Sequence, residues 1–395
     1  GGNVQAIGTK TDGSRWKVGV QSPDDTESMI GAYEAADEAV ITSGAYERYF
    51  EKDGKTYHHI IDPATGKPSE KDLEHFKNAK ALCIDISLMD ERIIKSELGD
   101  LTNVDVIIGG PPCQGFSNAN KNYVEADDPR NKLFFEFVKF VDLANPYVVV
   151  IENVPQIITK NHGYAKDRIT EIFQKRGYSV TNAILDASEY GVPQKRLRNF
   201  FIITKGEQFD MSSIIKTNKK ITVEEAIGEL YPFENLKAEK VELLCKPKTE
   251  YQKYLRSKNN IVVNHDIHYP AEIQQKRISF VPQGGNWKYV PEELWKTTRT
   301  QRDGRSNRHS SAYKRLDEKN VSVTIDAGNQ HSNYYHPIYN RIPTVREAAR
   351  LQSFPDDFIF LGTMTEQYLQ VGNAVPPLLA KSIAEAIRKR LENEE

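Results

Sequence analysis

The segment VIIGGPPCQGFS, residues 106–117, is the most informative part of this sequence. Its apolar residues predict a short buried strand, which the following glycines and prolines end. In a parallel α/β sheet the chemistry lies at the carboxyl ends of the strands. Pro111 and Pro112 have a fixed φ and would hold the thiol of Cys113 in place. We therefore expect a parallel α/β sheet with a reactive cysteine at a strand end; a cysteine that only lines the core is the alternative.

Strands and helices alternate after this segment, which favours a parallel sheet. One further apolar strand ends directly before Glu152, and another begins directly after Arg198. With these two strands included, the helices and strands are expected over residues 81–86 (strand), 88–98 (helix), 128–143 (helix), 148–151 (strand), 167–176 (helix), 180–185 (strand), 199–204 (strand), 345–352 (helix) and 378–391 (helix).

Length and composition limit the possible classes of protein. A chain of 395 residues predicts about two or three domains. Apolar residues make up 38% and charged residues 27%, with no run of about 18 apolar residues and no secretory signal, so we expect a globular protein without a membrane partner. The cysteines form no metal-type pair, so we expect no metal site and a reducing cytoplasm.

The net charge of −2 conceals a basic block. Residues 241–320 hold 16 Lys and Arg against 9 Asp and Glu, whereas residues 1–80 hold 10 against 14. Aromatic residues are interleaved with these basic residues, a pattern that points to a polyanionic partner. A solvated lysine-rich surface is the alternative.

Residues 80–395 resemble the DNA (cytosine-5) methyltransferase family through several motifs in the family's order. They are PPCQGFS (111–117), ENV (152–154), QKRLR (194–198), TVREAARLQ (344–352) and GNAVPP (372–377). The resemblance implies an S-adenosylmethionine-dependent methyltransferase (Rossmann-like) sheet, S-adenosyl-L-methionine as cofactor and double-stranded DNA as partner. It also implies transfer of methyl to carbon 5 of cytosine in a specific sequence, as in restriction-modification systems.

The resemblance assigns catalytic roles that suit the residue types. Cys113 would add to carbon 6 of the ring as the nucleophile. Glu152 would serve ring nitrogen 3 as an acid, and Arg198 would stabilise charge on the carbonyl oxygen. Arg196 would support the loop or a phosphate. A helix cap at Glu152 and a surface strand arginine at Arg198 are the alternatives.

The family's pattern also implies cofactor and DNA contacts. The base must leave the duplex to react, and a smaller, irregular target-recognition domain would read the sequence. Asp85 would bind the cofactor; the alternative is that it caps the helix over 88–98. The expected cofactor-binding residues are Asp85, Ile86, Pro111, Pro112, Leu133, Asn373 and Val375. The expected DNA-binding residues are Gln114, Ser117, Gln194, Gln283, Gly284, Arg302 and Arg305.

Residues 1–70 form a short β-rich fragment of a different character. The segments SGAYERY (43–49) and HHIIDPATG (58–66) resemble the FAD:protein FMN transferase family. His59 and Asp62 could be remnants of a flavin site. The alternative is that His58 and Asp62 serve only the hairpin predicted between residues 46–50 and 56–61 and the loop that follows it. A working flavin transferase would need segments that this fragment does not carry.

The methyltransferase sheet is expected to be missing its first strands. A Phe-x-Gly-x-Gly loop for the cofactor does not occur between Gly1 and Lys80. An inactive DNA-binding remnant and an enzyme completed by a second chain are therefore alternatives. The expected domains are residues 1–70 (flavin-transferase-like), 71–80 (junction), 81–206 with 361–395 (catalytic) and 207–360 (target recognition).

Overall fold

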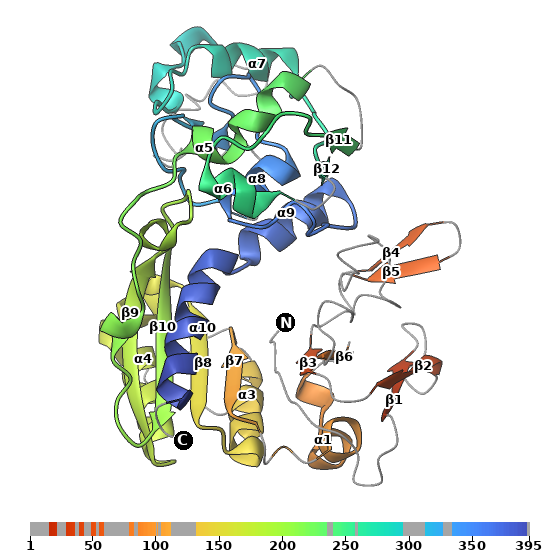
Figure 1. The fold of residues 1–395 in the computed structure, drawn as a ribbon, viewed down its shortest axis with the longest axis vertical. Helices are drawn as coiled ribbons and strands as arrows, with labels where there is room; N and C mark the ends of the chain where they lie inside the picture. Colours follow the sequence, from red (N-terminus) through yellow and green to blue (C-terminus); the bar gives the residue numbers. More distant parts are fainter. Residues whose placement is uncertain are drawn as a thin grey trace. The chain divides into compact units, whose positions relative to one another are not determined.

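The computed structural model divides into two compact units, which are described separately (Figure 1). Unit 1 comprises Gly1–Leu185 and Leu197–Ser213, and unit 2 comprises Asp186–Arg196 and Ile214–Glu395. The structure describes residues 16–21, 29–35, 39–42, 49–52, 55–58, 79–82, 86–99, 101, 104–111, 132–234, 240–256, 260–294, 313–326 and 334–392.

Short strand pairs make up the described part of the first 82 residues. Two pairs are antiparallel and one is parallel. The predicted hairpin forms between Tyr49–Lys52 and Lys55–His58, and the rest of its predicted strands, residues 46–48 and 59–61, lies outside the described residues. The pairs are β1 (Trp16–Gln21) with β2 (Met29–Ala35), β3 (Ala39–Thr42) with β6 (Ala79–Leu82), and β4 (Tyr49–Lys52) with β5 (Lys55–His58).

A four-stranded sheet in the order β7-β8-β10-β9 forms the centre of unit 1. Strand β7 runs parallel to β8, as expected, but β10 runs antiparallel to β8, so the prediction of a parallel sheet was wrong at this strand. The reason lies in residues 187–196, which join β9 to β10 and are too few for the long crossover that parallel neighbours need. The strands are β7 (Val106–Gly109), β8 (Val148–Asn153), β9 (Tyr178–Asp186) and β10 (Leu197–Lys205).

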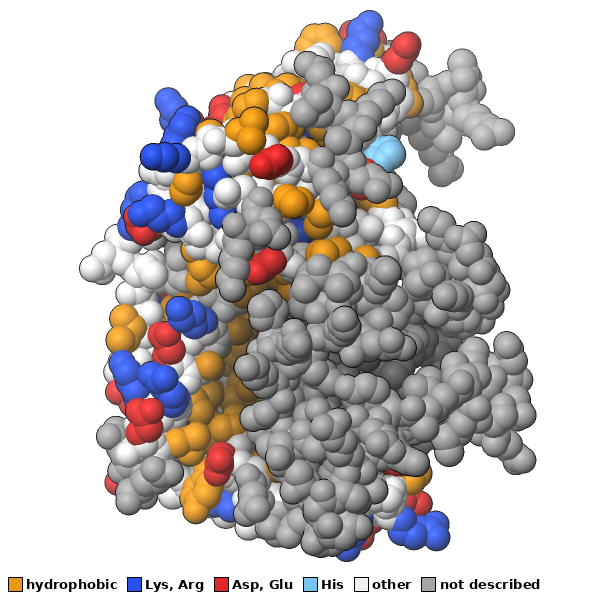
Figure 2. Space-filling model, turned by 45° about the vertical axis from the view of Figure 1, so that its right-hand side comes forward, with side chains coloured by type: hydrophobic (Ala, Val, Ile, Leu, Met, Phe, Trp, Pro, Cys, Tyr) orange, Lys and Arg blue, Asp and Glu red, His pale blue; other side chains and the backbone are white. Residues whose placement is uncertain are grey.

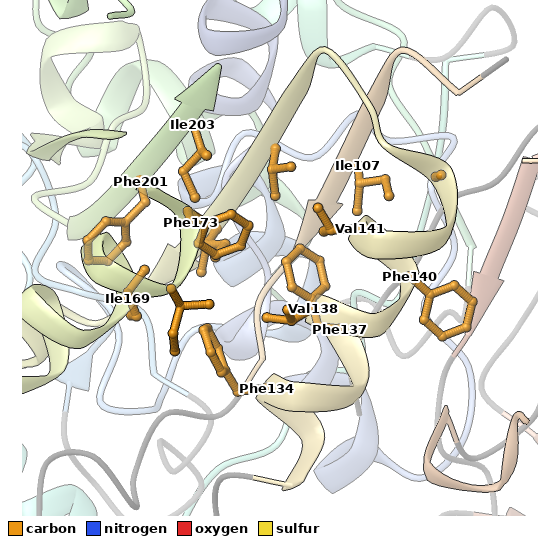
Figure 3. Packing of buried hydrophobic residues seen from close by; sticks show 14 of the residues in the cluster. Ile107, Phe134, Phe137, Val138, Phe140, Val141, Ile169, Phe173, Phe201 and Ile203 are labelled. Atoms are coloured by element: carbon orange, nitrogen blue, oxygen red, sulfur yellow. The ribbon is translucent and has the colours of Figure 1, made fainter. Parts of the chain in front are cut away.

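Helices cover one face of this sheet and bury its alternate residues. Phe134, Phe137, Val138 and Val141 line one side of α3, as the helical spacing predicted, and pack with sheet residues such as Phe201 (Figure 3). Successive strand residues point to opposite faces, so Ile108, Val150 and Phe200, which alternate with core residues of β7, β8 and β10, point away from this core. The helices of unit 1 are α1 (Glu91–Leu98), α3 (Lys132–Ala144) and α4 (Tyr164–Gln174).

The start of α1 corrects one prediction. Asp90, rather than Asp85, caps this helix: its Oδ1 accepts a hydrogen bond of 2.8 Å from the backbone N–H of Ile93. The helix therefore begins at Glu91 and not at Leu88. An aspartate directly before the first turn satisfies an amide that would otherwise lack a partner.

Unit 2 is built mainly from helices around a second core. The predicted helices over 345–352 and 378–391 are confirmed within a residue or two. Its elements are α5 (Val223–Ile227), α6 (Glu250–Leu255), α7 (Glu272–Ser279), α8 (Val345–Leu351), α9 (Met364–Asn373), α10 (Pro377–Glu392), β11 (Lys240–Glu242), β12 (Ile261–Val263), β13 (Lys314–Arg315) and β14 (Tyr334–Tyr335).

Buried ion pairs hold α8 in this core. Thr344 and Glu347 form a capping box at its start, and Glu347 also binds the guanidinium of Arg341 at 2.7 Å. Arg341 in turn binds Glu234 at 2.6 Å, and all three side chains are buried. Burial alone would raise the pKa of the Glu347 carboxyl, but Arg341 holds that pKa well below its ordinary value.

Replacing Glu347 with glutamine is expected to destabilise the protein by about 3 kcal/mol at neutral pH, because the buried Arg341 loses one of its carboxylates. The folded-state pKa of Glu347 is depressed, so its stabilisation is present above an unfolded pKa of about 4.3 and is lost as pH falls. Urea unfolding of wild type and Glu347→Gln at several pH values measures both effects. The two proteins should converge in acid.

The matched control is Glu171→Gln, which removes an exposed carboxylate that pairs with Lys175 and Arg168 on α4. Exposed pairs contribute little to stability, so this variant should unfold like wild type. Equal stability of Glu347→Gln and wild type at neutral pH would show that the buried pair is not stabilising.

Candidate active site

The carboxyl ends of β7 and β8 lie side by side and bring two of the motifs together. The strands are parallel, with Gly109 opposite Ile151 in the register (Figure 1). Gly110 and Pro111 therefore leave the sheet at the same edge as Glu152 and Asn153. The structure confirms a short strand that ends at Gly109, but the prediction that it is buried holds for one face only, because Ile107 is 1% exposed and Ile108 is 46% exposed.

Glu152 forms an ion pair with Arg198 at this edge. The Nε of Arg198 lies 2.9 Å from Oε1 of Glu152, and the side chains are 16% and 22% exposed, respectively. The register explains the pairing: Phe200 lies opposite Glu152, and Arg198 lies two residues away on the same face. Burial lowers the pKa of the Arg198 guanidinium, and Glu152 opposes that shift. The pair thus places a carboxyl and a guanidinium next to each other, with both side chains mostly buried.

The second oxygen of this carboxyl faces Gly110. A Cβ atom built on Gly110 would lie 3.3 Å from Oε2 of Glu152, which is closer than ordinary contact distance. Arg198 fixes Oε1, so Oε2 is the oxygen turned toward the chain that leads to Cys113. The absence of a side chain at Gly110 keeps this approach open.

Replacing Gly110 with alanine is expected to reduce the turnover number about tenfold, because Glu152 must move by a few tenths of an ångström, and misplaced catalytic groups are costly. Steady-state methylation kinetics provide the measurement. Gly228→Ala is the matched control, since its Cβ would meet Glu224 Cγ at the same 3.3 Å in unit 2. Unchanged turnover in Gly110→Ala would show that the position of Oε2 does not matter.

Asn153 secures the backbone next to this pair. Its Nδ2 donates to the carbonyl oxygen of Pro111 at 3.1 Å, and its Oδ1 accepts from the N–H of Val154 at 3.0 Å. The start of the Cys113 segment is therefore tied to β8. The motifs of the sequence do not predict this role of Asn153; the available signal is an amide directly after a strand-end acid, beside a second strand end.

Several predicted site residues lie outside the described residues, and their roles stay predictions. These residues are Asp85, Pro112, Cys113, Gln114, Ser117, Arg302 and Arg305. His59 and Asp62 also lie outside them.

Ile86 and Leu133 belong to the core of unit 1. Ile86 is 4% exposed, so nearly all of its side chain is used in packing. Leu133 is partly buried against the same core. Pro111 is buried as well, and its carbonyl is the acceptor for Asn153. The side chains of Ile86 and Leu133 therefore contribute apolar packing, and no polar group, to unit 1.

Unit 2 presents Asn373 and Val375 near the end of α9. Asn373 is exposed and Val375 is partly exposed, so both side chains are accessible. An exposed amide offers hydrogen-bond donors and acceptors, which suits a polar cofactor. Unlike these accessible side chains, Arg196 and Gln194 are both 0% exposed.

The burial of Gln194 and Arg196 changes how the QKRLR motif is interpreted. Arg196 donates to backbone carbonyls, which is the loop-supporting role and leaves no exposed guanidinium for a phosphate. The side chain of Gln194 is engaged inside unit 2, so it has no surface to offer a DNA base in this structure. The motif thus contributes Arg198 to the ion pair and buries Gln194 and Arg196, whereas Lys195 and Leu197 are exposed.

Gln283 and Gly284 lie in an exposed loop of unit 2. The Gln283 amide and Glu318 are joined twice: Nε2 donates to the carboxylate at 2.8 Å, and Oε1 accepts from the Glu318 N–H at 3.1 Å. Gly284 has a φ of +74°, which favours glycine. The loop is held in shape and remains a candidate for DNA contact.

The described surface carries charges of both signs. Figure 2 shows lysine and arginine side chains mixed with aspartate and glutamate side chains on the face that it draws. Five of the 16 Lys and Arg residues of the predicted basic block fall on residues 295–312, which lie outside the described residues. Among the helices that the structure describes, none combines the length and apolar character needed to cross a membrane.

Comparisons with known proteins point to the same chemistry. A family model described as C-5 cytosine-specific DNA methylase matches residues 70–389, and a model of the ApbE family matches residues 1–76. The chain is 42% identical over 295 residues to type II methyltransferase M1.HphI of Haemophilus parahaemolyticus, covering 74% of this chain and 70% of the relative. It is 38% identical over 341 residues to type II methyltransferase M.DdeI of Desulfomicrobium norvegicum, covering 80% and 79%.

One solved structure is also similar over most of the chain. It is a protein described as a DNA modification methyltransferase encoded within an Escherichia coli prophage. The TM-score is 0.61 at 25% identity, and the match covers 81% of this chain and 89% of that protein. The α/β fold is therefore shared with DNA methyltransferase structures.

Proposed function

The chain belongs to the C-5 cytosine-specific DNA methylase family, and from this premise we propose which of its residues carry out the reaction. It is a DNA (cytosine-5-)-methyltransferase of the type II, restriction-modification kind. The observation that supports the residue roles is the Glu152–Arg198 ion pair at the strand edge from which the chain leads to Cys113.

In the proposed reaction the thiolate of Cys113 adds to carbon 6 of the cytosine ring. The electron pair of the 5,6 double bond is then shared by carbon 5, ring nitrogen 3 and the carbonyl oxygen. Glu152 shares a proton with ring nitrogen 3 through Oε2, while Arg198 stabilises the charge on the carbonyl oxygen. Carbon 5 would then take the methyl group as the methyl–sulfur bond breaks, and S-adenosylhomocysteine would leave with the electron pair of that bond. Loss of the carbon 5 proton restores the double bond and expels the thiolate.

The family uses S-adenosyl-L-methionine, which supplies the methyl group when it is bound. Asn373 and Val375 fit a cofactor site because their side chains are accessible. Asp85, Ile86, Pro111, Pro112 and Leu133 complete the set of cofactor contacts that the family resemblance implies.

The DNA contacts are proposed for the region around residues 207–360, as the target-recognition domain, with 81–206 and 361–395 as the catalytic domain. The cytosine must leave the helix to reach Cys113. Arginine and amide side chains then read the flanking bases. Gln283, Gly284, Arg302 and Arg305, together with Gln114 and Ser117, are the proposed contacts. Double-stranded DNA of one specific sequence is the proposed substrate.

Methyl transfer itself is the test. The full chain is incubated with methyl-labelled S-adenosylmethionine and duplex DNA of mixed sequence, and the labelled nucleoside is identified. Label in 5-methylcytosine is the expected result. Folded protein that transfers no label would reject activity by this chain alone.

A second candidate is an enzyme that needs another polypeptide for its cofactor site. It is favoured by residues 1–76, which match the ApbE family in the place where the glycine-rich cofactor loop is expected. The first strands of the methyltransferase sheet would then come from a second chain. Calorimetry with S-adenosylhomocysteine separates the candidates: binding by the chain alone supports the first, and no binding supports the second. No flavin binding would dismiss an activity of the N-terminal fragment.

A further inference from the structure

Residues 371–378 comprise the end of α9, the short link to α10 and the start of α10, and they carry both accessible cofactor candidates, Asn373 and Val375. We call these residues the α9–α10 connection. Its backbone is held at both ends by residues that directly follow α8. The Nε2 of Gln352 donates to the carbonyl oxygen of Val371 at 2.7 Å, and the N–H of Leu378 donates to Oγ of Ser353 at 3.2 Å. Gln352 and Ser353 are both 0% exposed.

Arg196 holds the middle of the connection. Its Nη2 donates to the carbonyl oxygens of Gly372 and Ala374, at 2.7 and 3.0 Å, which are the residues on either side of Asn373. Its Nη1 donates to the carbonyl oxygen of Ile325 at 2.8 Å. A planar guanidinium can bind several carbonyls at fixed angles, which a lysine ammonium cannot reproduce. The two bonds to the connection therefore fix the backbone at Asn373.

Gln194 joins these contacts into one buried network. Its Nε2 donates to Oε1 of Gln352 at 2.9 Å and lies 3.2 Å from the carbonyl oxygen of Leu351. Its Oε1 accepts from the N–H of Ile325 at 2.8 Å. Gln194, Arg196 and Gln352 thus connect three separate motifs through bonds within unit 2. Buried hydrogen bonds of this kind strengthen one another and specify a single arrangement.

We propose that Arg196, supported by Gln194 and Gln352, is a positioning residue that fixes the α9–α10 connection so that Asn373 and Val375 face the cofactor. The inference rests on the proposed function, because that function makes these residues cofactor contacts. The backbone of the connection is held while its two candidate side chains stay accessible. A site fixed before binding avoids the entropic cost of ordering it.

The test compares Arg196→Lys with Arg315→Lys in the full chain. Arg315 is a matched control, since it is 5% exposed and also binds several carbonyls of unit 2, including those of Ile278 and Ile338. The affinity for S-adenosylhomocysteine is measured by calorimetry. Arg196→Lys is expected to weaken binding about tenfold or more, the loss typical of a hydrogen bond to a charged group, and Arg315→Lys should leave it unchanged.

Hydrogen exchange supplies a readout that needs no cofactor. Peptides that cover residues 366–378 should lose protection in Arg196→Lys and keep it in Arg315→Lys, while peptides from α8 stay protected in both. Arg196→Met, which removes all donors, should extend the loss. Unchanged exchange in the connection would overturn the inference even if activity fell.

The outcomes separate the inference from the proposed function. Wild-type protein that fails to bind S-adenosylhomocysteine counts against the cofactor assignment, while the exchange data still judge the positioning role. If wild type binds S-adenosylhomocysteine and both lysine variants bind it with the wild-type affinity, the inference is overturned and the proposed function is left intact. Equal weakening in both variants also overturns it, because a general loss of structure would explain that result.

Discussion

Replacing Cys113 with serine is expected to abolish methyl transfer. A hydroxyl is a far weaker nucleophile than a thiolate near neutral pH, and without addition to carbon 6 the ring cannot attack a methyl group. Methyl-labelled S-adenosylmethionine and duplex DNA, followed to a single turnover, give the measurement. DNA binding should persist, because the substitution changes one atom.

The control is Cys245→Ser, which changes the exposed cysteine of unit 2 in the same way. It should keep full activity. DNA that carries 5-fluorocytosine adds a second readout: fluorine cannot leave carbon 5 as a cation, so the covalent adduct persists and the protein migrates with the DNA. Adduct formation by Cys113→Ser would place the nucleophile elsewhere.

The strand ends of unit 1 could be predicted because short apolar runs report burial directly. The segment before Gly109 and the one before Glu152 each hold consecutive apolar residues, which predict strands covered on both faces. Residues 148–151 of β8 are buried throughout, whereas Ile108 of β7 is 46% exposed. Glycine, proline and polar residues then mark where each strand stops. The parallel pairing of β7 with β8 follows from the long connection between them, which contains α3.

The direction of β10 could not be predicted from the same signals. An apolar run shows that residues 199–204 are buried but not which way the strand runs. The short link over residues 187–196 was the usable evidence, since a parallel crossover needs more chain. Because β10 runs against β8, Arg198 comes to the same edge as Glu152 at the start of its strand instead of at the end.

The buried polar residues of unit 2 were beyond the sequence for another reason. Arg196 and Gln194 have side chains that are usually exposed, so a surface role is the natural expectation. Their burial depends on backbone partners more than 100 residues away in the chain. These are the carbonyls of Ile325 and Gly372 for Arg196, and the N–H of Ile325 and the carbonyl of Leu351 for Gln194. Hydrogen-bond satisfaction is a property of the folded chain, and no local pattern reports it.

Replacing Glu152 with glutamine is expected to reduce the turnover number by about 10²–10⁴-fold, the usual contribution of a positioned acid or base. The amide keeps the shape of the carboxyl but cannot share a proton with ring nitrogen 3, and Arg198 loses its ion partner. Single-turnover methylation at several pH values measures the effect, and DNA affinity should change little. A fall in affinity with unchanged turnover would instead assign Glu152 to binding.

The matched control is Glu136→Gln, because Glu136 is also a partly buried carboxylate of unit 1 with an ion partner, Lys139, at 3.3 Å. Its turnover should equal that of wild type. Arg198→Lys and the double variant complete a cycle. If Glu152 and Arg198 act on the same ring as one unit, their effects will be far from additive, since the loss of either partner already disables the pair. Additive losses would mean that the two side chains serve separate steps.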